Sequence, residues 1–320
     1  MMDGIINVYK EKGYTSHDVV AKMRGILRMK KIGHTGTLDP EAEGVLPVCL
    51  GSGTRLCDML ADRTKTYRAV LLLGLETDTQ DTTGRILAQA PVQVTGGQVR
   101  QTAASFLGTY MQVPPMYSAL KVGGKKLYEL ARAGKEVERA ARPVEILELK
   151  VEDICLPRVT LEVTCSKGTY IRTLCHDIGR KLGCGGCMEG LVRTRVGEFC
   201  LEDSLTLDRI EALRDAGQAE TVVCPVDRVF AGLPGLRMCP GEGDKLARNG
   251  NPFRPGLARV WMQPGKTAQE SGNREPGQVP VPLEYPRVRV YDSGLRFIGV
   301  YEYQEAKGQY KPQKLFPGGS

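Results

Sequence analysis

Several kinds of residue and pattern are scarce in this chain of 320 residues. It has only 3 histidines and 1 tryptophan, and its aromatic content is 6%. No apolar run approaches the length of about 20 residues that a membrane-spanning helix needs. The start, "MMDGIINVYK", is not typical of a signal peptide, because Asp3 and Gly4 interrupt it and no apolar stretch follows. We therefore expect a cytoplasmic protein with no membrane association.

The motifs of several large enzyme classes are also missing. The chain has no G-x-x-x-x-G-K-[ST] or G-x-G-x-x-G phosphate loop, no H-E-x-x-H zinc motif and no G-x-S-x-G nucleophile motif. Its histidines are not spaced as metal ligands. Of its 10 cysteines, Cys184 and Cys187 form a C-x-x-C pair, but a zinc ribbon needs a second such pair. We expect buried thiols and no metal; a metal or redox role for this pair is the weaker alternative.

The composition that is present describes an ordinary globular protein. Hydrophobic residues make up 41% and charged residues 25% of the chain, which is long enough for more than one domain. The net charge is +7, from 44 Lys and Arg against 37 Asp and Glu. This mild excess favours a polyanionic partner only slightly.

Strand and helix patterns are mixed along residues 3–232 without a regular βαβ period, which predicts an α+β fold. Helices are expected over 15–29, with Ser16 as N-cap, and over 171–183. The segments 142–154 and 158–174 alternate as neighbouring antiparallel strands would.

Composition changes near residue 235 and predicts a second domain. From 262 to 286 the chain holds five prolines and three glycines and is expected to form a long loop. After the loop, "RVRVYDSGLRFIGVYEY" shows two apolar alternating runs around "DSG", which is typical of a hairpin. We therefore expect a small all-β C-terminal domain.

The stretch "KKIGHTGTLDPEAEGVLPVCLG", residues 30–51, places a single aspartate, Asp39, in a loop of small and apolar residues. An Asp before a Pro is usually a turn former. The upstream helix, however, brings basic residues towards this loop. They could form a patch that faces RNA phosphates or simply a charged face in contact with solvent, and the two interpretations are equally good. These cations are Lys22, Arg24, Arg28, Lys30 and Lys31.

Two tyrosines lie among basic residues elsewhere in the chain. Tyr67 stands in "KTYRA", and Tyr170 stands in "KGTYIRTL" with Arg172 two residues on. In a strand, Tyr170 and Arg172 would point to the same face. A tyrosine for stacking, an arginine for pairing and an ionised aspartate together indicate a pocket for a nucleobase.

Four blocks in order resemble successive motifs of the bacterial tRNA pseudouridine-55 synthase family (TruB). They are "GHTGTLDPEAEGVLPVCLG", "KTYRAVLLLGLETDTQDTTG", "VPPMYSALKVGGKKLYELAR" and "SKGTYIRTLCHDIG", and the similarity covers roughly residues 3–230. The resemblance implies a catalytic domain over 1–232, built on a mixed, largely antiparallel sheet with flanking helices. A basic thumb insertion at about 118–142 is implied within it. A PUA-like RNA-binding domain over 233–312 would follow, interrupted by the loop at 262–286.

The resemblance also implies roles for individual residues. Asp39 would be the nucleophile in the isomerisation of a flipped-out uridine 55, with attack on the sugar or on the base both open. Tyr67 would stack on the uracil and Tyr170 is a candidate to remove the carbon-5 proton, while Arg172 would pair with Asp39. The residues implied to bind substrate are His34, Leu191, Lys10, Lys125, Lys126 and Arg132. The implied partner is the T-arm of tRNA, with no cofactor, no metal and no obligate protein partner, so a monomer is expected.

The sequence departs from the family pattern beside the aspartate, where "DPEAEG" brings Glu41 and Glu43 close to Asp39. Carboxylates near RNA phosphates are costly unless paired, and Lys30 or Lys31 could pair with them. Two rival functions fit less well. A non-catalytic RNA-binding protein has no need of Asp39, Tyr67 and Arg172 together. A phosphohydrolase with an aspartyl nucleophile needs a second Asp two residues after the first. A synthase guided by a separate RNA is a closer rival, but it normally carries a different C-terminal extension.

Overall fold

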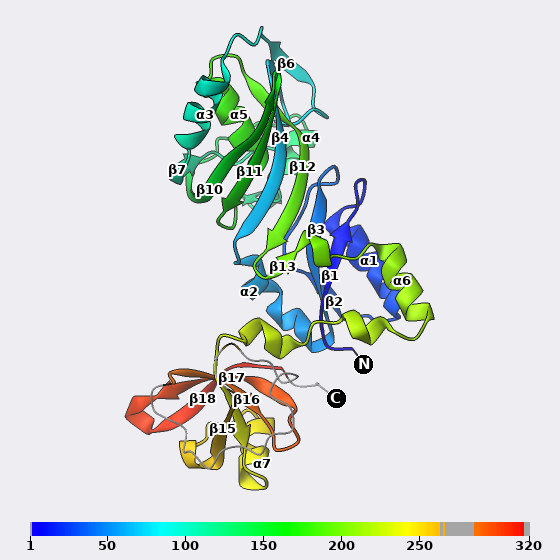
Figure 1. Cartoon of the computed structure of the whole chain (residues 1–320), viewed down its shortest axis with the longest axis vertical. Helices are drawn as coiled ribbons and strands as arrows, with labels where there is room; N and C mark the ends of the chain where they lie inside the picture. Colours follow the sequence, from blue (N-terminus) through cyan, green and yellow to red (C-terminus); the bar gives the residue numbers. More distant parts are fainter. Residues whose placement is uncertain (1, 263–264, 266–284, 317–320) are drawn as a thin grey trace.

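The structure is a computed structural model, and it describes residues 2–262, 265 and 285–316. Figure 1 shows an elongated molecule in which a long twisted sheet occupies one end and the middle, and a smaller sheet lies at the other end. The expected Pro/Gly-rich loop at 262–286 lies almost entirely outside the described residues. Among the described residues, no helix has both the length and the apolar character needed to cross a membrane.

The larger sheet has nine strands, and all pairs but one are antiparallel. The predicted mixed, largely antiparallel sheet is therefore confirmed. Its strands in spatial order are β1 (Gly4–Lys10), β3 (Glu43–Leu50), β12 (Gly186–Val196), β4 (Lys65–Leu73), β11 (Arg158–Cys165), β10 (Arg142–Cys155) and β7 (Gly108–Gln112), with β2 (Ile32–His34) paired to β3 and β13 (Phe199–Cys200) paired to β12.

The two halves of this sheet meet where β12 runs parallel to β3. Only Val192↔Glu43 and Arg193↔Gly44 pair across this junction. Gly44 has a φ of +104°, and a Cβ there would collide with the carbonyl oxygen of Arg193. A glycine is therefore needed at this position, a few residues after Asp39, for the two halves to approach closely.

Two pairs of helices cover the sheet. Helices α1 (Ser16–Leu27) and α6 (Leu207–Asp215) pack on the β1–β3 half around Val19, Met23 and Ile210. Helices α3 (Gly96–Ala104) and α5 (Ile171–Lys181) cover the β10–β11–β4 half, as Figure 1 shows. The remaining helical turns are α2 (Cys57–Ala61), α4 (Leu127–Arg132), α7 (Glu242–Arg248) and the 3-10 segments Gly51–Leu56, Leu201–Asp203, Ala219–Val222, Val226–Phe230, Pro255–Leu257 and Glu305–Lys307.

Ser16 does not cap α1 as predicted. Thr15 is the N-cap: its side chain accepts from the Asp18 N–H, and the Asp18 carboxylate accepts from the Thr15 N–H, which completes a capping box. Ser16 is buried instead, and its hydroxyl accepts a 2.9 Å hydrogen bond from the Leu38 N–H. Because Thr15 caps the helix, the hydroxyl of Ser16 is available to bind the backbone of Leu38, the residue before Asp39.

The smaller sheet has five strands and its own core. In spatial order they are β15 (Ala258–Met262), β14 (Gly235–Met238), β16 (Arg287–Tyr291), β17 (Phe297–Gln304) and β18 (Gln309–Leu315). Strands β16 and β17 form the predicted hairpin around "DSG". The prediction of an all-β region was wrong, because α7 packs Ala247 into this core. Phe230 packs against Phe316, with ring centroids 5.8 Å apart, in a core cluster that also includes Val300 and joins the two sheets.

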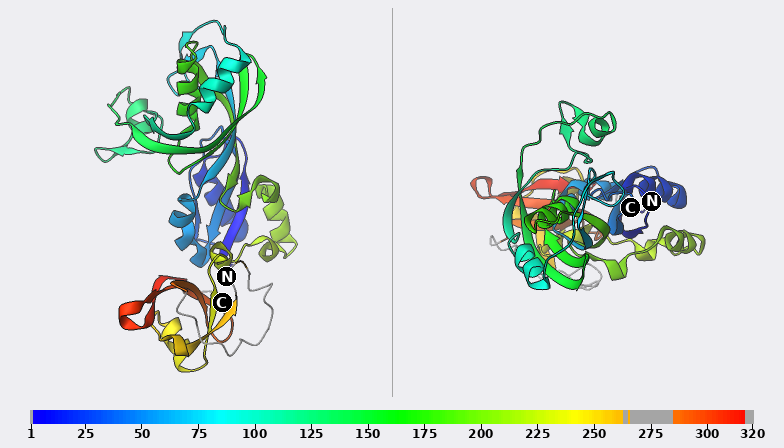
Figure 2. Two further views of the ribbon diagram at one scale, coloured as in Figure 1. Left: turned by 60° about the vertical axis from the view of Figure 1, so that its left-hand side comes forward. Right: turned by 90° about the horizontal axis from the view of Figure 1, so that it is seen from above.

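A thumb segment stands away from the larger sheet, which Figure 2 shows in green beside the body of the molecule. It carries the short hairpin β8 (Lys121–Val122) and β9 (Lys125–Lys126), followed by α4. Two further strands, β5 (Leu75–Thr77) and β6 (Ile86–Gln89), form a separate hairpin.

Candidate active site

A pocket of about 430 Å³ opens where β4 and β12 meet the loop before β3 and the start of α5. The loop at 36–39 forms one wall, and the residues at 166–172 form another. Its lining includes most of the residues predicted to be catalytic or to bind the base: Asp39, Tyr67, Tyr170, Arg172 and Leu191. Its volume lies in the range that small-molecule sites occupy, so an extruded nucleobase fits.

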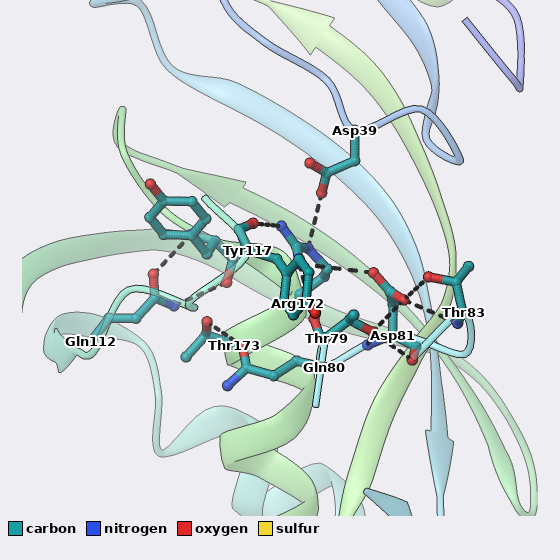
Figure 3. Close-up of polar contacts among 10 residues, drawn as sticks. Asp39, Thr79, Gln80, Asp81, Thr83, Gln112, Tyr117, Arg172 and Thr173 are labelled. Atoms are coloured by element: carbon teal, nitrogen blue, oxygen red, sulfur yellow. Dashed lines mark hydrogen bonds and ion pairs between the residues drawn. The ribbon is translucent and has the colours of Figure 1, made fainter. Parts of the chain in front are cut away.

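Asp39 and Arg172 form an ion pair inside this pocket. The Nε of Arg172 lies 2.9 Å from the Oδ2 of Asp39, as Figure 3 shows. The arginine side chain is only 6% exposed, whereas the aspartate side chain is 43% exposed. The carboxylate is therefore accessible to a substrate while its cation is buried behind it.

The rest of the Arg172 guanidinium is held by the protein. Its Nη1 donates to the carbonyl of Thr79 at 2.9 Å, and its Nη2 donates to the carbonyl of Tyr117 at 2.7 Å. Asp81 lies 3.8 Å from Nη1 through Oδ2. The Oδ1 of Asp81 accepts a 2.6 Å hydrogen bond from the hydroxyl of Thr83 (Figure 3). This bond fixes the Asp81 carboxylate within the turn that carries both residues. Arg172 is thus fixed by several segments, and its direction towards Asp39 is set in advance.

The predicted helix over 171–183 is confirmed at its start, since α5 begins at Ile171, but the strand pattern over 158–174 ends earlier than expected. Tyr170 and Arg172 therefore do not share a strand face. Strand β11 ends at Cys165, and Tyr170 is the N-cap of α5. The β-branched and aromatic residues of "TYIR" favour a strand locally. The segment nevertheless forms a helix, because Ile171, Leu174 and Ile178 recur on one helical face and are buried in the core.

Lys10 supports the Asp39 loop from beneath. The side chain is fully buried, and its Nζ donates to the carbonyls of Glu11, Pro40 and Ala42 at 3.0, 3.1 and 2.5 Å. Burial lowers the pKa of the Lys10 ammonium to about 8, although the nearby carboxylates Glu43, Asp39 and Glu41 act in the opposite direction. The prediction that Lys10 binds substrate is therefore corrected: its donors are used on the loop, and its burial keeps it from RNA.

Tyr67 and Arg193 are cross-strand neighbours on β4 and β12 at the floor of the pocket. The Arg193 side chain is 1% exposed, and its Nε donates to the carbonyl of Val45 at 2.7 Å. Burial raises the pKa of the Tyr67 phenol, and Arg193 opposes that shift. Tyr67 is therefore a neutral ring that offers stacking surface. Leu191, opposite Ala69, supplies an apolar wall.

His34 lies outside the pocket lining. Its ring meets that of His17 edge to face, with centroids 5.1 Å apart, and its Nδ1 accepts from the Gly36 N–H at 3.3 Å. Burial lowers the pKa of His34, and the neighbouring His17 lowers it further. The imidazole is therefore neutral at neutral pH and packs beneath the loop that leads to Asp39.

The acidic residues next to Asp39 are paired, but not with Lys30 or Lys31 as predicted. Glu41 forms a 3.2 Å ion pair with Lys12, and Glu43 accepts from the hydroxyl of Tyr9 at 3.3 Å. Both partners come from "YKEKG", residues 9–13, a segment about 30 residues before these acids.

The predicted thumb cations lie on the exposed hairpin and on α4. Lys125 is exposed, while Lys126 and Arg132 approach the ring of Tyr128 at 5.4 and 5.6 Å from its centroid. A cation held over an aromatic ring is confined to one side of the segment. The thumb thus carries an ordered basic surface.

The cysteines form no metal centre in the part of the chain that the structure describes. Cys184 and Cys187 are buried thiols, and burial raises the pKa of Cys187 to about 11. The prediction that the scattered cysteines are all buried was wrong for Cys155, which is exposed, and for several others that are half-buried.

Sequence reasoning missed Asp81, Arg193 and Gln112. Asp81 stands in "TDTQDTTG", a run of small polar residues typical of a turn, and Arg193 stands two residues after the predicted Leu191. An acidic residue in a turn, or an arginine in an apolar strand, indicates a functional site only when the residues that it contacts are known. The partners here come from distant segments.

The chain is similar in sequence and fold to known proteins. The model described as "TruB family pseudouridylate synthase (N terminal domain)" matches residues 24–171, and "tRNA pseudouridylate synthase B C-terminal domain" matches residues 172–231. A protein of Lachnoclostridium phytofermentans named tRNA pseudouridine synthase B is 47% identical over 98% of this chain and 100% of its own. One of the same name from Alkaliphilus oremlandii is 51% identical over 71% of this chain and 75% of its own.

Among solved structures, a chain of a Cbf5-Nop10-Gar1 complex matches with a TM-score of 0.67 and 25% identity. The match covers 98% of this chain and 85% of that one. The fold is therefore that of the pseudouridine synthases. Within that class, the chain belongs to the TruB family.

Proposed function

We propose that this protein is a tRNA pseudouridine synthase that converts uridine 55 in the T-loop of tRNA to pseudouridine. The observation that carries this proposal is the exposed Asp39 carboxylate, paired with the buried Arg172 in a pocket with tyrosine and leucine walls. The family and the names of its relatives agree with this chemistry.

Asp39 acts as the nucleophile in this proposal. The reaction breaks the bond between N1 of uracil and C1′ of ribose and joins C1′ to C5. The proton on C5 is lost and N1 gains one, so atoms balance without an oxidant, a metal or an added water. One carboxylate is sufficient because the base is kept, whereas glycoside hydrolysis uses a second carboxylate to activate water.

The surrounding residues hold the extruded base. Tyr67 stacks on the uracil, Leu191 covers an edge of it, and Tyr170 stands at the rim of the pocket as the candidate to remove the C5 proton. Arg172 holds the Asp39 carboxylate and directs it into the pocket. His34 supports the loop on which Asp39 stands.

The thumb binds the T-arm through Lys125, Lys126 and Arg132. The two-sheet organisation supports a catalytic domain over 1–232 and a PUA-like RNA-binding domain over 233–312. We further propose that the protein works in the cytoplasm as a monomer on its tRNA substrate, without an obligate protein partner.

Incubating the purified protein with an unmodified tRNA transcript and mapping pseudouridine by chemical probing tests this function. We expect modification at uridine 55 and at no other uridine of the T-arm. A matched transcript with cytidine at that position should stay unmodified. Modification elsewhere, or none at all, would overturn the proposal.

A further inference from the structure

The side chain of Gln112 holds the backbone of Tyr170 with both ends of its amide. Its Nε2 donates to the Tyr170 carbonyl at 3.0 Å, and its Oε1 accepts from the Tyr170 N–H at 2.8 Å. Gln112 is the last residue of β7 and is 1% exposed. Figure 3 shows it to the left of Arg172, whereas Asp39 lies above that side chain. This paired contact joins the edge strand of the sheet to the first turn of α5.

The remaining donor of the amide is also used. The Nε2 of Gln112 donates to the hydroxyl oxygen of Tyr110 at 2.7 Å, and that hydroxyl donates to the Oδ2 of Asp177 at 3.0 Å. Burial raises the pKa of Tyr110, so its hydroxyl stays protonated and remains the donor to Asp177. The chain of bonds therefore allows only one orientation of the Gln112 amide.

Tyr170 needs this support because it begins α5 without a cap from its own side chain. Its carbonyl accepts from the Leu174 N–H at 3.1 Å in addition to the Gln112 amide, while its N–H points out of the helix towards Gln112. A shielded N–H without a partner at a helix start is costly, and this half-buried one is paired by Gln112, so the contact fixes where the helix begins. The direction of that first turn sets both the Tyr170 ring and the Arg172 guanidinium.

The same short segment also reaches Arg172 directly. Five residues after Gln112, the carbonyl of Tyr117 accepts from Arg172 Nη2 at 2.7 Å. Residues 112–117, where β7 leads into the thumb, therefore contact both Tyr170 and Arg172, which line the pocket at the start of α5.

We propose that Gln112 is a positioning residue for the isomerisation. It does not line the pocket, and it acts through Tyr170, whose backbone it fixes so that Arg172 meets Asp39 in the required direction. The activity part of this inference rests on the proposed function; the backbone contact does not.

Two substitutions test the contact. Gln112→Met keeps the side-chain volume and removes all of its hydrogen bonds. Gln112→Glu keeps an oxygen that accepts from the Tyr170 N–H, but it replaces the NH2 group that donates to the Tyr170 carbonyl by a second oxygen. We expect single-turnover pseudouridine formation with saturating enzyme to fall at least about tenfold in both, equivalent to about 1.4 kcal/mol. The dissociation constant for tRNA should stay within about twofold, because the phosphate contacts are unchanged. The matched control is Gln101→Met, on the exposed face of α3.

Hydrogen exchange of the Tyr170 amide supplies a readout that does not depend on activity. It should accelerate in Gln112→Met and stay protected in Gln112→Glu, while the Leu174 amide stays protected in both. Turnover within about twofold of the wild type in a folded variant would overturn the proposal, as would a loss explained by weaker tRNA binding alone. If Gln112→Met does not fold, the turnover and tRNA affinity of Gln112→Glu alone test the proposal. An inactive wild type would instead overturn the proposed function, and the exchange data would still test the contact.

Discussion

The Nε of Arg172 lies 2.9 Å from the Oδ2 of Asp39, and the arginine is the buried member of the pair. Because the guanidinium is also bound by the carbonyls of Thr79 and Tyr117, the protein holds the cation and the cation holds the carboxylate. The ion pair is therefore a positioning device, and its loss should affect turnover more than tRNA binding.

Substitution of Arg172 tests this arrangement. Arg172→Lys keeps a charge but loses the planar group that binds several partners at once, and we expect turnover to fall about 30-fold to 100-fold. Arg172→Met should be worse and should also lower the melting temperature, since buried carbonyls are left without donors at a cost of about 1–3 kcal/mol each. Single-turnover assays and thermal unfolding measure both effects. Normal turnover in Arg172→Met would show that the pair has no part in catalysis.

Asp81→Asn tests the second carboxylate on the same guanidinium. Asp81 lies 3.8 Å from Arg172 Nη1, farther than Asp39, and its Oδ1 is held by Thr83. We expect a smaller loss, about threefold to tenfold in turnover, because removing this charge lets the guanidinium shift. Asp78→Asn is the matched control in the same turn, since its Oδ1 accepts from the Arg85 N–H and not from Arg172. Equal effects of the two substitutions would contradict the assignment.

Lys10 should make stability depend on pH in the alkaline range. Its pKa in the folded protein is lowered to about 8 from the usual 10.5, so between these values the unfolded chain binds more protons than the folded one. The free energy of unfolding should therefore rise with pH over this window, by on the order of 2 kcal/mol from Lys10. Lys10→Met should lack this rise, and Lys12→Met, at an exposed position, should keep it. Denaturant unfolding between about pH 7.5 and 10 compares them, and parallel curves for wild type and Lys10→Met would contradict the account.

The thumb should control affinity and its dependence on salt. Reversing the charge of Lys125 and Lys126 together should weaken tRNA binding and flatten the plot of log affinity against log salt by about one unit per lost phosphate contact. Turnover of the saturated complex should change less. The matched control reverses Arg100 and Arg209 on the exposed faces of α3 and α6. An unchanged slope in the thumb variant would mean that these lysines make no phosphate contacts.

The sequence predicts the residues of the pocket better than it predicts the residues that support them. Asp39, Tyr67 and Arg172 were placed in one nucleobase pocket from their residue types, and the resemblance supplied the ion pair that the structure contains. The alternation of β10 and β11 and the "DSG" hairpin were predicted correctly, because period and turn chemistry are local signals.

What the sequence did not predict depends on contacts between distant segments. Lys10 is 32 residues from Ala42, and Gln112 is 58 residues from Tyr170, so no local pattern pairs them. The helix predicted over 171–183 begins where α5 does, but the strand pattern predicted over 158–174 runs too far, because β11 ends at Cys165. The pairing of Glu41 with Lys12 likewise appears only when the two loops meet.

The most direct test of the central claim is pseudouridine formation by Asp39→Asn, measured in single turnover on a tRNA whose binding is measured in parallel. Glu41→Gln, two residues away and paired with Lys12, is the matched control that removes a neighbouring charge. The account predicts no detectable pseudouridine from Asp39→Asn, with a tRNA affinity close to that of Glu41→Gln and a near-normal rate for the control. Activity above about one tenth of the wild type, a loss of less than about 1.4 kcal/mol, would contradict the assignment of Asp39 as nucleophile.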